Sequence, residues 1–238
     1  MVAFVATPAE AVAAVPDGAV VMIGGFGTAG QPMELIDALI DSGARELTVV
    51  NNNAGNGDRG LAALIRERRV RRIVCSFPRQ ADSHCFDTEY RAGRIELELV
   101  PQGNLAERIR AAGAGIGAFY TPTGYGTPLA AGKEVRDIGG RHHVLEYPIH
   151  ADLALISAHA ADAVGNLVYR KTARNFGPIM AAAARTTVVQ VRELRPVGGI
   201  DPEHVVTPSI HVDRVVRVAA GPVPGPGGNV LPRAEEQR

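Results

Sequence analysis

The chain alternates short apolar runs with segments whose apolar residues recur at helical spacing. In its first half the apolar runs of strand length are residues 19–23, 46–50, 71–77 and 95–100. Helical spacing occurs at residues 32–42, 60–68, 86–92 and 105–112, and an earlier helix begins at the capping sequence Thr7-Pro8-Ala9-Glu10. This alternation predicts parallel strands joined by crossover helices. The expected fold is an open, mostly parallel, doubly wound α/β sheet with helices on both faces.

The second half continues the pattern after a segment rich in chain breakers. Residues 113–127, GAGIGAFYTPTGYGT, hold too many glycines and prolines to form a regular element. Strands are expected near 142–146, 152–158, 167–171 and 186–191, with a helix led in by TARNFGPIMAAAA. The chain closes with a Pro/Gly-rich and then polar stretch. We therefore expect one domain over residues 1–218 and a flexible tail over 219–238.

Polar or glycine-rich residues follow three of the first-half strands. A glycine turn at 24–30 follows the first, Asn52 lies in the NNNAG run after the second, and Gln102 lies in PQG after the last. Ligands of doubly wound sheets bind at the carboxyl ends of the strands, beside a topological switch point. The sequence therefore predicts a ligand site built from these three tips.

The glycine turn has the spacing Gly25-x-Gly27-x-x-Gly30, which is typical of dinucleotide-binding proteins. Binding of NAD also needs an acidic residue at the tip of the second strand, to hold the ribose hydroxyls. That tip reads NNNAGNG and has no carboxylate. The pattern therefore favours a phosphate-handling or purely structural turn over an NAD site.

Other candidate chemistry is sparse. Arg170, Lys171 and Arg174 concentrate positive charge after a strand-like run and could clamp a carboxylate or phosphate, or face solvent. The seven histidines and two cysteines lack metal-ligand spacing, so no metal site is expected. The sequence has no Gly-x-Ser-x-Gly nucleophile motif.

Composition narrows the class of partner. The 25 basic and 25 acidic residues balance, which argues against nucleic acid or an anionic membrane as a partner. No apolar run is long enough to span a membrane, and the N-terminus lacks the basic region of a signal peptide. We expect a cytoplasmic protein.

Several long strings then resemble one family. DGAVVMIGGFGTAGQP (17–32) resembles the first signature of the family I CoA-transferases. The likeness continues through VNNNAG, ELVPQGNLAERIRAAGAGIGAFYTPTGYGT and YRKTARNFGPIMA, over roughly residues 4–215. The chain is most similar to the A (alpha) subunit of that family. Within the family its second half is most similar to enzymes that act on 3-oxoadipate, followed by acetoacetate and acetate enzymes.

The resemblance implies transfer of CoA from succinyl-CoA to a 3-oxo acid, through a glutamyl-CoA intermediate. In the family the nucleophilic glutamate lies in a Ser-Glu-Asn-Gly motif of a B subunit, and this chain has no Glu-Asn-Gly. The resemblance thus implies a heterodimer or heterotetramer with a B subunit. CoA or acyl-CoA is then a substrate, and no cofactor is tightly bound.

The resemblance also implies roles for particular residues. Asn52 and Gln102 match positions that line the active site, although the run Asn51 to Asn53 leaves open which asparagine faces it. The role of a further set of residues follows from charge rather than from the resemblance: Arg170, Lys171 and Arg174 would hold the distal carboxylate of such a substrate, unless they face solvent or the partner. The CoA-binding element would be the glycine turn, namely Gly24, Gly25, Phe26, Gly27, Thr28, Ala29 and Gly30.

Three other classes of function remain open from the residues alone. An NAD-dependent oxidoreductase is disfavoured by the missing acid. A sugar-phosphate isomerase or deacetylase-like hydrolase would need its own acid and base within the chain. A non-catalytic nucleotide-binding module would stay inactive with any B subunit.

Overall fold

The computed structural model describes residues 1–219, 223–224 and 230–231 of the 238-residue chain. The flexible tail predicted at 219–238 therefore lies almost wholly outside the described residues. Of that stretch the structure describes a short antiparallel pair, β13 (Val223–Pro224) and β14 (Val230–Leu231).

A nine-stranded sheet forms the body of the molecule. Its strand order is β1-β12-β11-β9-β2-β3-β4-β5, and β10 pairs with β9. Every pairing along this order is parallel, and only β10 runs antiparallel to its neighbour among the described strands of this sheet. The strand bounds are β1 Ala3–Val5, β2 Val20–Ile23, β3 Leu47–Val50, β4 Val70–Cys75, β5 Glu96–Leu99, β9 Ala151–Asp162, β10 Leu167–Val168, β11 Ala184–Arg195 and β12 Arg214–Arg217. The predicted open, mostly parallel α/β sheet is confirmed.

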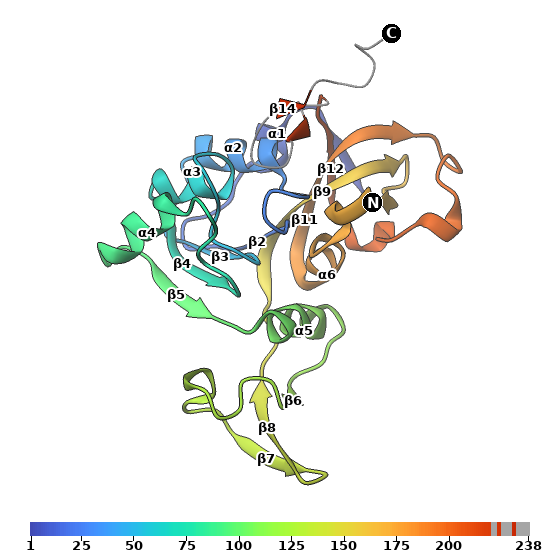
Figure 1. The fold of residues 1–238 in the computed structure, drawn as a ribbon. Coiled ribbons are helices and arrows are strands. Elements are labelled where there is room, and N and C mark those ends of the chain that lie inside the picture. The colour runs from blue at the N-terminus through green and yellow to red at the C-terminus, as the bar shows by residue number, and fades with distance from the viewer. Residues whose placement is uncertain (220–222, 225–229, 232–238) are drawn as a thin grey trace.

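Helices cover both faces of this sheet (Figure 1). One face carries α1 (Pro8–Ala11), α2 (Met33–Asp41), α3 (Leu61–Arg66) and α4 (His84–Arg91), and the other carries α5 (Gln102–Gly113) and α6 (Gly177–Ala183). The reason lies in the strands, where successive side chains point to opposite faces. Val21 and Ile23 pack in the first core and Met22 in the second. Each face is therefore apolar and needs its own helical layer.

Strands are added to the sheet in opposite directions on the two sides of the β2–β9 pair. From β2 the strands proceed through β3 and β4 to β5, whereas β9, β11 and β12 extend the other way. Neighbouring β2 and β9 thus mark the topological switch point, and ligands of doubly wound sheets bind beside such a point at the carboxyl ends of the strands. The glycine turn begins at this edge, directly after β2.

A smaller antiparallel sheet extends from the body beyond α5 (Figure 1). It has the order β6-β8-β7, with β6 at Phe119–Thr121, β7 at Val135–Ile138 and β8 at Arg141–Glu146. The expectation of no regular element in 113–127 was wrong for β6. Three residues between glycines become a strand because β8 supplies their hydrogen-bonding partner.

Several helices and strands begin or end at other residues than predicted, because neighbouring residues and paired strands set their ends. Helix α5 begins at Gln102, immediately after Pro101 and three residues before the predicted start. Strands β9 and β11 run for 12 residues each because each extends the other's hydrogen-bonded ladder. The predicted strand at 167–171 ends at Val168. Short 3-10 turns occupy η1 (Pro128–Ala130), η2 (Lys171–Arg174), η3 (Pro202–His204) and η4 (Ser209–His211).

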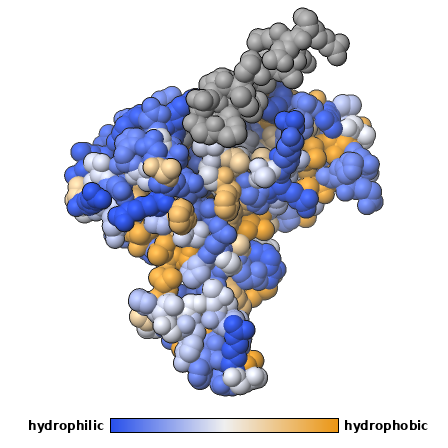
Figure 2. Space-filling view, viewed as in Figure 1, coloured by the Kyte–Doolittle hydropathy of each residue, from blue (hydrophilic) through white to orange (hydrophobic). Residues whose placement is uncertain are grey.

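Large apolar side chains are exposed near the carboxyl ends of the strands. Phe26, Phe77 and Leu99 are 51%, 60% and 41% exposed, and they follow or end β2, β4 and β5. Figure 2 shows hydrophobic residues gathered where the body narrows towards the small sheet. Within the described residues, the helices are too short or too polar to cross a membrane.

Candidate active site

The glycine turn is a tight reversal closed by its own backbone. The N–H of Phe26 donates to the carbonyl of Ala29 at 3.0 Å, and the N–H of Ala29 donates back at 3.2 Å. Gly25, Gly27 and Gly30 have φ of +131°, +60° and +76°. Side chains disfavour such values, so the turn depends on glycine.

Gly30 also allows a close approach between two distant segments. A Cβ at Gly30 would lie 2.8 Å from the carbonyl oxygen of Ala173 and 3.1 Å from the Nδ2 of Asn175. Asn175 Nδ2 donates to the carbonyl of Ala29 at 3.0 Å. The turn after β2 is thereby fixed against the η2 segment.

Backbone N–H groups at the start of α2 already donate to other groups of the protein. The N–H of Leu35 donates to Oε1 of the buried Gln190 at 3.2 Å, and the N–H of Met33 donates to the carbonyl of Gln31 at 3.1 Å. Pro32 has no N–H to offer. A dinucleotide fold uses these amides to hold a pyrophosphate. Their occupation adds to the missing acidic residue as a reason against an NAD site.

Two of the three consecutive asparagines hold the backbone after β3. Asn51 is fully buried, and its Nδ2 donates to the carbonyl of Ile23 at 2.6 Å. Its Oδ1 accepts from the N–H of Asn53 at 2.9 Å, and Asn53 Oδ1 in turn accepts from the N–H of Gly55 at 3.0 Å. Asn51 and Asn53 therefore shape the loop.

Asn52 connects the tips of three strands. Its Oδ1 accepts from Ser76 Oγ, after β4, and from Gln102 Nε2, at the start of α5 after β5, each at 2.8 Å. Asn52 is only 3% exposed, whereas Gln102 is exposed. No acceptor for Asn52 Nδ2 is found in the described part of the chain. The pair thus presents neutral amide donors and acceptors at the carboxyl edge of the sheet.

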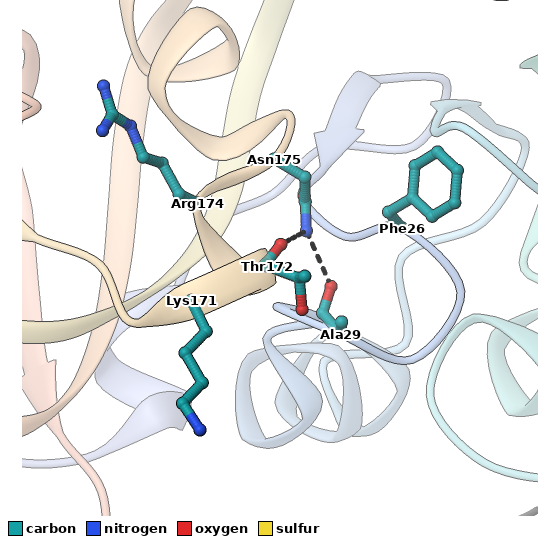
Figure 3. Close-up of a pocket in the computed structure, with 6 residues that line it drawn as sticks. All are labelled: Phe26, Ala29, Lys171, Thr172, Arg174 and Asn175. Carbon is teal, nitrogen blue, oxygen red and sulfur yellow. Dashed lines mark hydrogen bonds between the residues drawn. The ribbon is translucent and has the colours of Figure 1, made fainter. Parts of the chain in front are cut away.

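The cationic cluster meets the glycine turn in a cavity of about 620 Å³. Six residues line this cavity, namely Phe26, Ala29, Lys171, Thr172, Arg174 and Asn175. Two regions more than 140 residues apart in the sequence, joined by the bond of Asn175 to Ala29, are therefore one site. In Figure 3 the side chains of Lys171 and Arg174 point in different directions, both away from Phe26. Arg170 precedes η2 and does not line the cavity.

The backbone of this cavity is strained at Lys171. Its φ is +51°, which is uncommon for a residue with a side chain and costs of order 1 kcal/mol. Two residues earlier in the chain, the hydroxyl of buried Tyr169 lies 2.8 Å from Thr207 Oγ1. Burial raises the pKa of Tyr169 to about 12, so it stays neutral. Strained residues persist where the surrounding structure holds them, often at ligand sites.

Neither cysteine of the chain is set up as an activated nucleophile in the structure. Burial raises the pKa of Cys75, at the end of β4, to about 12, and burial also raises that of Cys85. A thiol must lose its proton to attack, and burial opposes that loss at both cysteines. The hydrogen-bond partners of Asn52 and Gln102 in the described chain are amides, a hydroxyl and backbone rather than carboxylates. Nor do the described His, Cys, Asp and Glu residues gather in threes as metal ligands.

Sequence analysis pointed to Asn52, Gln102 and both segments that line the cavity, and the structure brings each set together. It did not point to Ser76 or Thr172. Ser76 carries a signal that was available, because it directly follows β4 as Asn51 follows β3. Thr172 carries no such signal. The place of Thr172 and Asn175 beside the glycine turn depends on the return of the chain after β10.

Comparison with known proteins gives consistent matches over most of the chain. A family model described as Coenzyme A transferase matches residues 5–218. The chain is 64% identical to the A subunit of the 3-oxoadipate CoA-transferase of Pseudomonas putida, over 89% of this chain and 91% of that protein. It is 47% identical to the human mitochondrial succinyl-CoA:3-ketoacid coenzyme A transferase 2, over 90% of this chain but 44% of the human protein.

A solved structure supports the fold independently. Glutaconate coenzyme A-transferase from Acidaminococcus fermentans superposes with a TM-score of 0.81 at 22% identity, covering 91% of this chain and 75% of that chain. The same sheet is thus reached from a distant sequence.

Proposed function

The chain belongs to the Coenzyme A transferase family, and we propose that it is the A subunit of a heteromeric 3-oxoadipate CoA-transferase. The proposal rests chiefly on the 64% identity to an A subunit of that name across nearly the whole of both chains. The carboxyl edge of the sheet supports it, because it offers ordered neutral amides at Asn52 and Gln102 and no nucleophile of its own among the described residues. Such a site needs a second chain to complete it.

The proposed reaction proceeds through a glutamate of the B subunit. Its carboxylate attacks the thioester carbon of succinyl-CoA, which gives a succinyl-glutamyl anhydride and CoA thiolate. The thiolate attacks the glutamyl carbonyl and releases succinate, leaving a glutamyl-CoA thioester. The 3-oxoadipate carboxylate displaces CoA thiolate from this thioester to form a second anhydride. The thiolate then attacks the 3-oxoadipyl carbonyl, giving 3-oxoadipyl-CoA and the free glutamate.

Asn52 and Gln102 have a defined part in these steps. Each attack places negative charge on a carbonyl oxygen, and amide N–H groups held in advance stabilise that charge. Asn52 Oδ1 is already saturated by Ser76 and Gln102. Its Nδ2 is therefore the group available to an oxyanion, and neutral amides do not compete as nucleophiles.

The glycine turn is proposed to contact CoA. Its backbone N–H groups at Gly25, Gly27 and Thr28 make no hydrogen bond within the described chain, and glycine lets a ligand approach the backbone closely. The turn also lies at the switch point between β2 and β9, where ligands of this class of sheet bind.

The B subunit is proposed to cover the exposed apolar residues at the same edge. Phe26, Phe77 and Leu99 would lose water contact there, and aromatic residues are enriched at such interfaces. The human relative supports this arrangement, because this chain matches less than half of that single polypeptide.

The test is reconstitution. We expect the purified chain to lack transferase activity, and to gain succinyl-CoA:3-oxoadipate activity when mixed with a CoA-transferase B subunit that has the Ser-Glu-Asn-Gly motif. Substitution of that motif's glutamate by alanine is the matched control and should abolish turnover. Robust turnover by the isolated chain would refute the proposal, as would lasting inactivity of the assembled heteromer.

The preference for 3-oxoadipate is proposed to come from the cation-lined cavity. A distal carboxylate needs a cationic partner, and Lys171 and Arg174 line the cavity to which the glycine turn also contributes. We expect Arg174→Ala to lower kcat/KM for 3-oxoadipate on the order of 10-fold or more while changing that for acetoacetate little. Arg170→Ala is the matched control, because Arg170 does not line the cavity. A wild-type preference for acetoacetate would contradict the substrate assignment, and an unchanged preference in Arg174→Ala would clear Arg174 of this role.

A further inference from the structure

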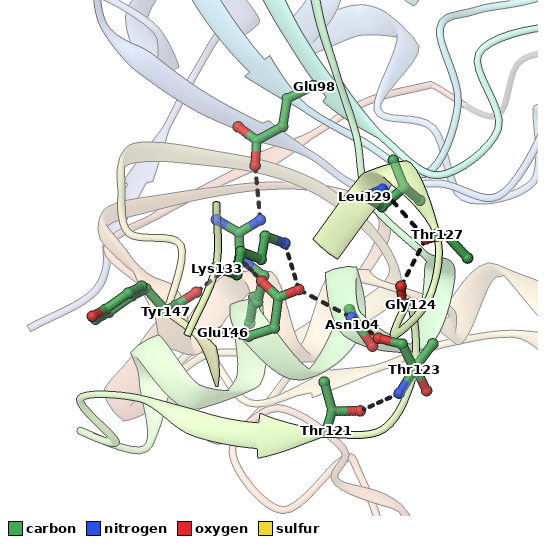
Figure 4. A network of polar contacts seen from close by, with 11 residues as sticks. Glu98, Asn104, Thr121, Thr123, Gly124, Thr127, Leu129, Lys133, Glu146 and Tyr147 are labelled. Atoms are coloured by element: carbon green, nitrogen blue, oxygen red, sulfur yellow. Dashed lines mark hydrogen bonds and ion pairs between the residues drawn. The ribbon is translucent and has the colours of Figure 1, made fainter. Parts of the chain in front are cut away.

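A buried carboxylate joins the small sheet to helix α5. Glu146 ends β8 with its side chain only 4% exposed. Its Oε1 accepts from Lys133 Nζ at 2.7 Å and from Asn104 Nδ2 at 3.1 Å, as Figure 4 shows. Its Oε2 lies 3.8 Å from the Nε of Arg108. A carboxylate so buried is stable only when its oxygens are paired. The small sheet and the first turn of α5 are therefore held in one arrangement.

The cluster extends along α5 to the main sheet. Arg108, one turn after Asn104, donates to the backbone carbonyl of Tyr147 and to Glu98 Oε1, each at 2.8 Å. Glu98 lies on β5 and also accepts from Arg72 on β4 at 2.5 Å. Burial alone would raise the pKa of Glu98, but its bonds to Arg108 and Arg72 outweigh burial and lower it. Helix α5 is thus held to both sheets by charged groups.

The first turn of α5 also carries Gln102, which forms the amide pair with Asn52. Gln102 lies two residues before Asn104 and donates to Asn52 Oδ1 at 2.8 Å. Asn104 Nδ2 also donates to the carbonyl of Thr123 at 3.2 Å, which places the 122–127 loop against the helix start. Gln102 itself is exposed. Its position therefore depends on how firmly the turn beneath it is held.

We propose that Glu146 is a positioning residue that sets the Gln102–Asn52 amide pair through Asn104. The proposal rests on the function proposed above, in which this pair stabilises the oxyanions. A misplacement of about 1 Å at a reacting centre can lower a rate on the order of 100-fold. Replacing the carboxylate by an amide keeps the shape of the side chain but removes the charge that faces Lys133 and Arg108. If the amide oxygen stays with Lys133 and Asn104, its N–H group is turned towards the Nε donor of Arg108. The first turn of α5 is then held less firmly, by neutral hydrogen bonds in place of charged ones, while the fold remains.

The decisive variant is Glu146→Gln, with Glu134→Gln as the matched control. Glu134 directly precedes β7 of the small sheet and also accepts hydrogen bonds, from Tyr120 and Arg136, but it is exposed. In the reconstituted heteromer we expect Glu146→Gln to lower kcat about 10-fold with KM for succinyl-CoA within about twofold, and Glu134→Gln to change neither.

A double-mutant cycle separates positioning from general destabilisation. If Glu146 acts through Gln102, its substitution in a Gln102→Ala background should lower kcat by less than about twofold, because the group that it positions is already gone. An equal loss of kcat in both backgrounds would overturn the proposal. So would a normal kcat in Glu146→Gln. Should Glu146→Gln not fold, Asn104→Ala breaks the same connection while leaving the ion pair of Glu146 with Lys133, and takes its place.

Hydrogen exchange of the chain gives a readout that is independent of activity. We expect faster amide exchange in the first turn of α5 in Glu146→Gln than in Glu134→Gln, with unchanged exchange in α2. Unchanged exchange at α5 would refute the positioning role even if the heteromer were inactive. A wild-type heteromer that does not transfer CoA would instead refute the proposed function and leave the exchange result to decide this inference.

Discussion

Substitution of Asn52 by alanine tests the amide pair most directly. Asn52→Ala removes the oxygen that accepts from Ser76 Oγ and Gln102 Nε2, each at 2.8 Å, and the Nδ2 group that is free to face an oxyanion. Two neutral hydrogen bonds contribute about 1 kcal/mol each to stability. For a domain of this size, about 2 kcal/mol lowers Tm by about 4–8 °C. Loss of one oxyanion donor lowers kcat on the order of 10²-fold.

Ser76→Ala provides the matched control. It removes one of the two bonds to Asn52 but leaves the Nδ2 group in place, so we expect Tm to fall by about 2–4 °C and kcat to fall less than about fivefold. Thermal unfolding of the isolated chain and steady-state kinetics of the heteromer measure the two effects. A near-normal kcat in Asn52→Ala would contradict a role of Asn52 in stabilising the oxyanion. So would a loss confined to KM, or an equal loss of kcat in Ser76→Ala.

Three further predictions concern packing and charge. Gly30→Ala should lower Tm and raise KM for acyl-CoA more than Gly27→Ala does. Both glycines have positive φ, but only at Gly30 would a Cβ approach the η2 backbone closer than 3.0 Å. Equal effects of the two substitutions would show that backbone strain alone matters. Gly113→Ala should destabilise the chain by about 1–3 kcal/mol, because its Cβ would lie 2.7 Å from α6. Gly103 is on the same helix, but a Cβ there would meet no atom within 4 Å. Denaturant unfolding should therefore find Gly103→Ala as stable as wild type or slightly more stable. The pKa of Glu98 is lowered below its usual 4.5, so its stabilising contribution is present above that value and is lost as the pH falls through the folded pKa. The difference in unfolding free energy between wild type and Glu98→Gln should therefore shrink on acidification. A difference that stays constant with pH would contradict the ion pairs of Glu98.

The glycine turn shows that the residues around a motif decide which ligand it can bind. Its spacing is that of a dinucleotide-binding turn, and a strand and a helix flank it as that fold requires. The amide of Leu35 in α2 is nevertheless taken by Gln190, which lies 155 residues later on β11. A motif match therefore states what the backbone can do, whereas distant side chains decide which groups remain for a ligand.

Local patterns along the chain were enough to predict the architecture and most of the residues of the candidate site. Apolar alternation places a strand in the sheet because one face of each strand must leave water, and glycine marks backbone that no other residue adopts easily. Both signals are local, so the strands of the first half and the turn at 24–30 could be predicted. Asn52 and Gln102 could be predicted too, because residues that follow parallel strands share one edge of the sheet.

The way those residues combine follows from long-range packing. Asn51, Asn52 and Asn53 are identical in chemistry, and the positions of Ile23, Ser76 and Gln102 make Asn52 the one that joins three strands. The cavity between the glycine turn and η2, and the anchoring of α5 by Glu146, likewise join segments far apart in the chain. No local pattern encodes the register of such contacts. The sequence therefore identified the chemical groups, and the fold determined which of them meet.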